Sequence, residues 1–134
     1  MSSTATPPHL FALDAPVRSF MRPGVVTVSE DTSLRQVQRA MLSHGVRAVL
    51  VNGRSRGWVT SRGLLAHLSE DLALVPAGSA ISEPTTVIEP GATAAEALQA
   101  LRDPRVSHLL VARTEHGPAE GVVSDLDLVR LTAA

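Results

Sequence analysis

The chain has 134 residues, enough for one compact core, whereas halves of about 60 residues would each be marginal alone. Its 44% hydrophobic and 19% charged residues indicate a globular protein, and the lack of cysteine excludes disulfides and thiolate metal sites. A net charge of −1 indicates no polyanionic partner, and no apolar run approaches membrane-spanning length. We expect a soluble, cytoplasmic protein with a short disordered start and no leader, which binds neither nucleic acid nor a membrane.

The charges are unevenly spread along the chain. Residues 15–68 hold eight Arg and two acids, whereas residues 69–134 hold four Arg and ten acids. This asymmetry could align two halves, or two subunits, head to tail. All the basic residues are Arg, which a compositional bias explains without phosphate binding.

The chain begins with a tail and a lead-in helix over residues 1–16. The β-branched residues 25–28 then predict a short strand. Ser33 and Gln36 have the spacing of a capping box, which places the start of a helix. Gly45 is a typical residue for the end of that helix.

A hairpin and a second helix complete the first half. Residues 47–51 and 57–60 predict two antiparallel strands, and Asn52-Gly53 predicts a turn after the first of them. A further helix is expected from apolar residues at helical spacing: Leu64, Leu65, Leu68 and Leu72.

The second half repeats this order. An offset of 60 pairs Ser33 with Thr93 and Gln36 with Glu96, so the capping box recurs. A longer turn over residues 113–119 then raises the offset to 64 for Gly57 and Gly121. We infer an internal duplication of a β-α-β-β-α unit, with repeats at 17–75 and 76–134.

The two copies differ where the last strand of each meets its helix. The second copy has Ser124 and, three residues later, Asp127, whereas the first has Thr60 and Gly63. An ionised Asp can accept two hydrogen bonds from a ribose diol, and a helix N-terminus favours phosphate. Ser-x-x-Asp before an apolar run is also a capping box. Both interpretations stay open, and the two roles could coexist.

The repeated unit resembles a CBS (cystathionine-β-synthase) domain, and the pair resembles a stand-alone Bateman module. The resemblance implies an α+β fold of two CBS repeats packed about a pseudo-two-fold axis, with two clefts between the repeats. It rests on matching segments in both copies: residues 26–28, 34–41, 44–51 and 57–60, and residues 86–88, 94–101, 105–111 and 121–127.

The resemblance also implies a ligand. Such modules often bind AMP, ADP, ATP or S-adenosylmethionine in a cleft, with the carboxylate on the ribose and the hydroxyl near the phosphates. Ser124 and Asp127 match that pattern, while Gly63 leaves the first cleft without the acid. Arg47 stands where the family often places a phosphate-binding residue, and its counterpart is Ser107. The full set of expected nucleotide-binding residues is Ser124, Asp127, Arg47, Thr27, Val28 and Thr60.

We therefore expect a non-catalytic regulatory module that senses energy state through its ligand, forms a homodimer and acts on a partner protein not yet identified. The alternative is a ligand-free dimerisation or docking module. We expect no resident cofactor, no metal site and no enzymatic activity, because no nucleophile elbow, P-loop or metal-ligand spacing is present. His108 and Trp58 are interpreted as residues that pack in the core or at an interface.

Overall fold

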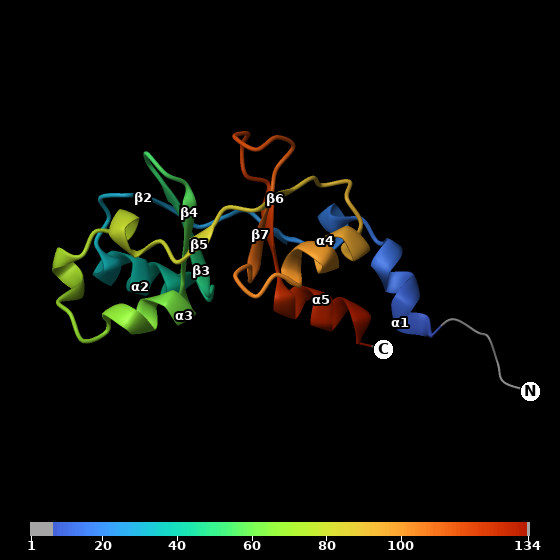
Figure 1. Cartoon of the computed structure of the whole chain (residues 1–134), viewed down its shortest axis with the longest axis horizontal. Helices are drawn as coiled ribbons and strands as arrows, with labels where there is room; N and C mark the ends of the chain where they lie inside the picture. Colours follow the sequence, from blue (N-terminus) through green and yellow to red (C-terminus); the bar gives the residue numbers. More distant parts are fainter. Residues whose placement is uncertain (1–6, 134) are drawn as a thin grey trace, which may run out of the picture. The chain divides into compact units, whose positions relative to one another are not determined.

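Two four-stranded sheets, each flanked by helices, form the α+β fold expected from the sequence (Figure 1). The computed structural model describes residues 7–133, so most of the predicted disordered start lies outside the described residues. The chain divides into two compact units. The central unit comprises Val25–Thr85, and the terminal unit comprises the chain up to Gly24 together with Thr86 onward.

The central unit has the strand order β2-β3-β4-β5, where β2 is Thr27–Ser29, β3 Ala48–Asn52, β4 Gly57–Thr60 and β5 Glu83–Pro84. Strands β2 and β3 are parallel, and the other neighbours are antiparallel. Its helical segments are α2 (Leu34–His44), α3 (Ser61–Leu64) and the 3-10 turns η3 (Leu65–His67), η4 (Leu72–Leu74) and η5 (Ala77–Ala80).

The terminal unit repeats this topology in the order β6-β7-β8-β1, where β6 is Val87–Ile88, β7 His108–Val111, β8 Gly121–Ser124 and β1 Arg22–Pro23. Again the first pair is parallel and the others are antiparallel. Its helical segments are α1 (Pro8–Phe11), η1 (Ala12–Asp14), η2 (Val17–Ser19), α4 (Ala94–Leu101) and α5 (Asp125–Thr132). The same order and pairing in both units confirm the predicted duplication.

Each sheet takes its fourth strand from the start of the other repeat, which we term the lead-in segment of that repeat. In the terminal unit, Ala94 donates its N–H to Ala15 O (2.8 Å) and Val17 donates to Ala92 O (2.7 Å). In the central unit, the same bonds join Leu34 to Val75 (2.8 Å) and Ala77 to Thr32 (2.7 Å). The compact units therefore exchange their lead-in segments, and the boundary at residues 75/76 stays a prediction about the sequence repeats alone.

The first long helix, α2, has the predicted ends. Gln36 N–H donates to Ser33 Oγ (3.2 Å) and Ser33 N–H donates to Gln36 Oε1 (3.2 Å), which completes the capping box. Gly45 ends the helix with a left-handed φ of 63°, a conformation that glycine adopts without steric cost.

Helix α4 has the same cap position but a shorter body. Glu96 N–H donates to Thr93 Oγ1 (3.2 Å), the first of the two bonds of the predicted box. The helix ends at Leu101. Pro104 stands at the position of His44 in α2, by the offset of 60, and disfavours helical backbone in the residue before it.

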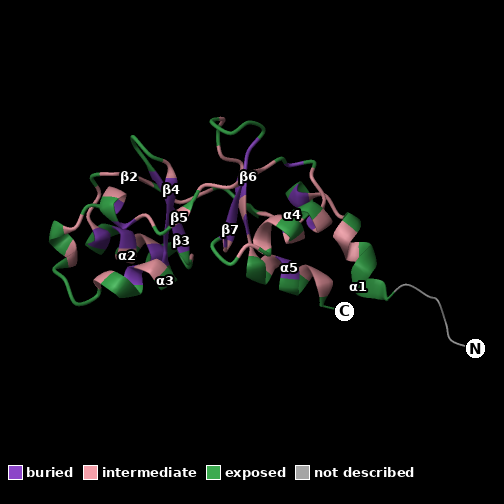
Figure 2. Ribbon diagram, in the orientation of Figure 1, coloured by how far each residue is buried: buried purple, intermediate pink, exposed green. Residues whose placement is uncertain are grey.

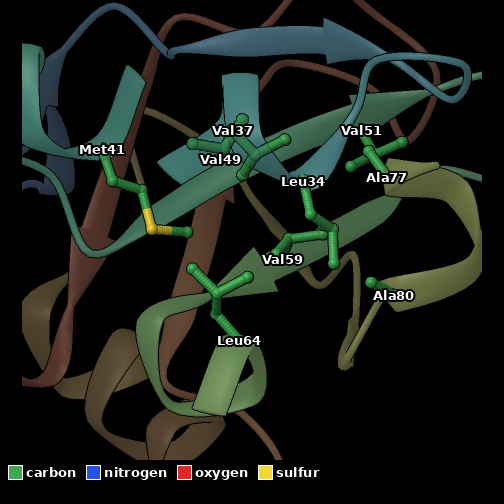
Figure 3. Close-up of a cluster of buried hydrophobic side chains, with 9 residues drawn as sticks. All are labelled: Leu34, Val37, Met41, Val49, Val51, Val59, Leu64, Ala77 and Ala80. Carbon is green, nitrogen blue, oxygen red and sulfur yellow. The ribbon is translucent and has the colours of Figure 1, made fainter. Parts of the chain in front are cut away.

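Each unit has its own apolar core (Figure 2). In the central unit, Leu64 points from α3 toward the side chains of α2 and β4 (Figure 3). In the terminal unit, Val17 of the lead-in segment lies fully buried among residues of α4, β7, β8 and α5. Burying a Val or Leu side chain contributes about 1.5–3 kcal/mol, so the exchanged segments are part of each core.

Two sequence expectations need correction. The first strand begins at Thr27 rather than Val25, because only Thr27–Ser29 pairs with β3. The helix expected through Leu72 ends at Leu64 and continues as a 3-10 turn. Leu64 is 6% exposed, whereas Leu65 and Leu68 are 56% and 50% exposed. The four leucines therefore do not form one core-facing stripe that would hold a longer helix.

The charge asymmetry of the sequence largely disappears in the folded units. By sequence, the central unit holds six Arg and five acids, and the terminal unit holds six Arg and eight acids. Arg18 and Arg22 come from the Arg-rich first half of the sequence but belong to the terminal unit. Glu70, Asp71 and Glu83 come from the acidic second half but belong to the central unit. The hypothesis of charge-driven head-to-tail pairing loses its main support.

Candidate functional site

The junction between β8 and α5, termed the second junction, is organised by the Asp127 carboxylate. Ser124 is extended (φ −107°, ψ 167°) and directly precedes the helix. Asp127 Oδ2 accepts two hydrogen bonds from Ser124, one from its backbone N–H (2.8 Å) and one from its hydroxyl (3.1 Å). The carboxylate therefore caps its own helix, as one interpretation of the spacing predicted.

The other oxygen of this carboxylate remains available. Asp127 is half-buried, and its Oδ1 accepts no hydrogen bond from any residue between 7 and 133. The buried side chains of Val123 and Leu128 hold the strand and the helix on either side. The capping bonds thus fix the orientation of a carboxylate that keeps one acceptor atom for another donor, and the two interpretations of Ser-x-x-Asp are compatible.

The junction between β4 and α3, termed the first junction, meets the same backbone requirements differently. Thr60 is 4% exposed, and its Oγ1 accepts a hydrogen bond from Gly63 N–H (2.9 Å). Ser82 supplies the partner for the remaining donors of Thr60. Its Oγ accepts from Thr60 N–H (3.4 Å) and lies 3.1 Å from Thr60 Oγ1.

Ser82 also occupies the space beside residue 63. A Cβ added at Gly63 would overlap Ser82 Oγ and lie 2.5 Å from Ser82 Cβ. Sequence reasoning missed Ser82, because it belongs to the lead-in segment of the other repeat and no local spacing links it to Thr60. A pattern confined to one repeat could not have found it.

The expected nucleotide-binding residues fall into both units. Thr27 and Val28 lie on β2, and Arg47 directly precedes β3. Arg47 is exposed, and its carbonyl accepts the N–H of Ser61 (2.8 Å), so it lies at the first junction beside Thr60. The Thr27 hydroxyl donates to Val25 O (3.4 Å). Parallel pairing places Thr27 opposite Leu50, three residues along β3 from Arg47.

The matching position in the terminal unit is Ser107. Its carbonyl accepts the N–H of Asp125 (3.2 Å), the counterpart of the bond from Ser61 to Arg47. Its hydroxyl lies 2.8 Å from His108 Nδ1. His108 is 8% exposed and Trp58 is fully buried, which agrees with their interpretation as packed residues. Each unit thus presents a different residue type at this position, a cation in one and a hydroxyl in the other.

Among residues 7–133, no group of three or more His, Asp or Glu side chains could hold a metal ion. Within the same range, no helix is long and apolar enough to cross a membrane.

Comparison with known proteins agrees with the duplicated architecture. The family model described as CBS domain matches residues 17–70 and again residues 77–134. Among curated protein sequences, none matches this chain.

Several solved structures share the fold. The CBS domain of a bacterial CNNM/CorC family Mg2+ transporter, solved in complex with ATP, is 23% identical over 92% of this chain and 90% of that chain, with a TM-score of 0.75. Hypoxic Response Protein I, solved with two coordinated zinc ions, is 24% identical over 87% of this chain and 98% of that one, with a TM-score of 0.70.

A hexameric CBS-CP12 protein from bloom-forming cyanobacteria is 17% identical, with 86% of this chain and 69% of that chain covered and a TM-score of 0.75. At such identities the likeness shows the fold alone.

Proposed function

The chain belongs to the CBS-domain family, and from that premise we propose that it is a non-catalytic regulatory module that binds an adenosyl ligand at its second junction. The observation that carries the proposal is the Asp127 carboxylate, oriented by two hydrogen bonds through Oδ2 while Oδ1 keeps its acceptor capacity. An ionised carboxylate forms charge-assisted hydrogen bonds with a diol, which are stronger than those of a neutral acceptor.

A related fold supports the choice of ligand. The CBS domain of the bacterial transporter named above was solved with ATP. We propose AMP, ADP, ATP or S-adenosylmethionine as the ligand of this chain, because all four carry a ribose diol for Asp127. Ser124 is proposed to contact the ligand beside Asp127. Thr27, Val28, Arg47 and Thr60 belong to the central unit, and their expected role in nucleotide binding stays a prediction separate from this site.

Regulation would follow from differential binding. A ligand shifts a conformational equilibrium only by the difference between its affinities for the two states. If ATP and AMP favour different states, the module reports energy state to a partner protein. We place this activity in the cytoplasm, which the lack of cysteine fits.

Isothermal titration with AMP, ADP, ATP and S-adenosylmethionine tests the proposal. At least one ligand should bind the wild-type chain. Asp127→Asn should lower the affinity for that ligand about 10-fold or more, since hydrogen bonds to a charged group contribute about 1.5–3 kcal/mol. Asp125→Asn is the matched control, because Asp125 is an exposed acid on the same helix turn. It should leave the affinity nearly unchanged.

Two outcomes would reject this function. One is the absence of binding heat for all four ligands at millimolar concentration. The other is an equal loss of affinity in the Asp125 and Asp127 variants, which would reduce the role of Asp127 to general charge.

A second candidate function, a homodimerisation or docking module, is favoured by exposed apolar side chains on the helices. Leu65 after α3 is 56% exposed, and Val129 on α5, its counterpart by the offset of 64, is 63% exposed. Each unit thus exposes an apolar side chain at the same position of its repeat, and exposed apolar surface marks interaction sites. We propose that these two positions contribute to a homodimer.

Sedimentation equilibrium of the wild type and of Leu65→Ser/Val129→Ser tests this candidate. A wild-type dimer that dissociates in the double variant supports it, provided that circular dichroism shows an unchanged fold. A wild-type monomer at all concentrations excludes the homodimer. Dimerisation without any nucleotide binding would favour the docking function over the sensor.

A further inference from the structure

We propose that Ser82 takes the place of the carboxylate that the first junction lacks. In the terminal unit, Asp127 Oδ2 accepts from the backbone N–H and the hydroxyl of Ser124. In the central unit, Ser82 Oγ lies within hydrogen-bond distance of the same two groups of Thr60, at 3.4 Å and 3.1 Å. One hydroxyl from the exchanged lead-in segment thus performs the capping role of the absent acid.

The sheet register defines how Ser82 reaches this position. Strand β5 places Glu83 opposite Trp58, so Ser82 immediately precedes the paired residues. Its N–H donates to Trp58 O (2.9 Å). In the terminal unit, β1 places Arg22 opposite Val122, and the residue before it is Met21. Methionine offers no hydroxyl, so the second junction needs an acceptor from its own helix.

Ser82 also accounts for glycine at position 63. Only Gly24 and Gly45 have positive φ among the described residues, so the backbone conformation at position 63 does not itself require glycine. The obstacle is contact, since an added Cβ would meet Ser82 Cβ at 2.5 Å. Rotation of the Ser82 hydroxyl cannot relieve this contact, because the Cβ of Ser82 does not move when its hydroxyl rotates. Residue 63 and residue 82 are therefore coupled.

The hydroxyls of the first junction offer a diol no carboxylate and little acceptor capacity. The Ser82 hydroxyl can donate to Trp58 O (3.4 Å) while it accepts both donors of Thr60. Thr60 Oγ1 accepts from Gly63 N–H, which uses one of its two lone pairs. The two hydroxyls therefore leave a single lone pair on the neutral oxygen of Thr60, which is 4% exposed, in contrast with the carboxylate oxygen Oδ1 of the half-buried Asp127. If the proposed function holds, on which this step rests, each chain binds one ligand.

A double-mutant cycle on thermal unfolding tests the coupling without any ligand. The variants are Gly63→Ala, Ser82→Gly and the double variant. Overpacking should lower the melting temperature of Gly63→Ala by about 5 °C or more. In the Ser82→Gly background, the same change should lower it by about 2 °C or less. Gly78→Ala is the control, because its added Cβ meets Glu30 and not Ser82. Its effect should be equal in both backgrounds.

Equal losses for Gly63→Ala in both backgrounds would overturn the proposal. If Gly63→Ala fails to fold, recovery by Ser82→Gly supports the proposal and a failure to recover overturns it. A chain that binds no nucleotide would refute the proposed function and leave this coupling intact. The two claims can therefore fail separately.

Discussion

The two strand–helix junctions differ in where their capping acceptor comes from. At the second junction, the acceptor is Asp127 of the same helix, whereas at the first it is Ser82, 22 residues from Thr60 in sequence. Buried backbone donors must be paired in either case. After capping, the Asp127 carboxylate still has an oxygen that can accept a hydrogen bond, whereas the Ser82 hydroxyl has used both of its lone pairs. Duplicated units can thus meet one structural requirement in two ways, of which only one leaves a carboxylate oxygen without a hydrogen bond among the described residues.

The strands that lead into the two junctions should differ in how much they contribute to the stability of the chain. Trp58 on β4 is fully buried, whereas its counterpart on β8, Val122, is only partly buried. Trp58→Ala should lower the free energy of unfolding by about 3–5 kcal/mol, because it leaves a large cavity. Val122→Ala should cost about 1 kcal/mol. Urea denaturation measures both, and equal costs would show that the two strands are anchored alike.

The next largest expected effect is a loss of nucleotide affinity when the ribose diol proposed to contact Asp127 is removed. ATP should bind the wild type about 10–100-fold more tightly than 2′,3′-dideoxy-ATP, since the latter loses the charge-assisted hydrogen bonds to Asp127. In Asp127→Asn, the two nucleotides should bind with more nearly equal affinity. Competition against a fluorescent ATP analogue measures both ratios. A preference that persists undiminished in the variant would assign the diol to another residue.

The helix caps offer a smaller contrast between the units. The Ser33 hydroxyl accepts from Gln36 N–H (3.2 Å) and donates to Gln36 Oε1 (3.4 Å), whereas the Thr93 hydroxyl forms only the first kind of bond, with Glu96 N–H. Ser33→Ala should destabilise the chain by about 1–2 kcal/mol and Thr93→Ala by about 1 kcal/mol. Ser43→Ala, at an exposed position of α2, is the control. Chemical denaturation should rank the three variants in this order, and a larger loss for Thr93 would contradict it.

The smallest effect belongs to the turn after α4. Hydrogen bonds from Arg105 hold the pKa of the Asp103 carboxyl below its ordinary value. A carboxyl with a lowered folded-state pKa stabilises the fold above its unfolded-state pKa and loses that contribution as pH falls through the folded value. The stability difference between wild type and Asp103→Asn should therefore shrink from about pH 6 to about pH 2. A difference that is constant with pH would show that the carboxylate charge is not involved.

Local patterns in the sequence predicted most of the fold. The capping box at Ser33, the left-handed Gly45 and the hairpin strands depend on neighbours within a few residues, so their spacing is visible in the sequence. The constant offset of 60 added the second copy. The resemblance of the repeated unit to a CBS domain is confirmed by the family model.

Features that depend on distant segments were not predictable in this way. The exchange of lead-in segments rests on bonds such as Val17 to Ala92, which no local period encodes. The leucines after Gly63 have helical spacing, yet their burial depends on the surrounding core, and only Leu64 is buried. Asp127 was found from its spacing, while Ser82 was not, because its contact with Thr60 crosses from one repeat to the other.

The most direct test of the unequal junctions is the number of ATP molecules bound per chain at saturation, measured by equilibrium dialysis on wild type, Asp127→Asn and Thr60→Val. The account predicts one ATP per wild-type chain, lost or strongly weakened in Asp127→Asn and retained in Thr60→Val. Two ATP per chain, or a single ATP that survives in Asp127→Asn and disappears in Thr60→Val, would contradict it.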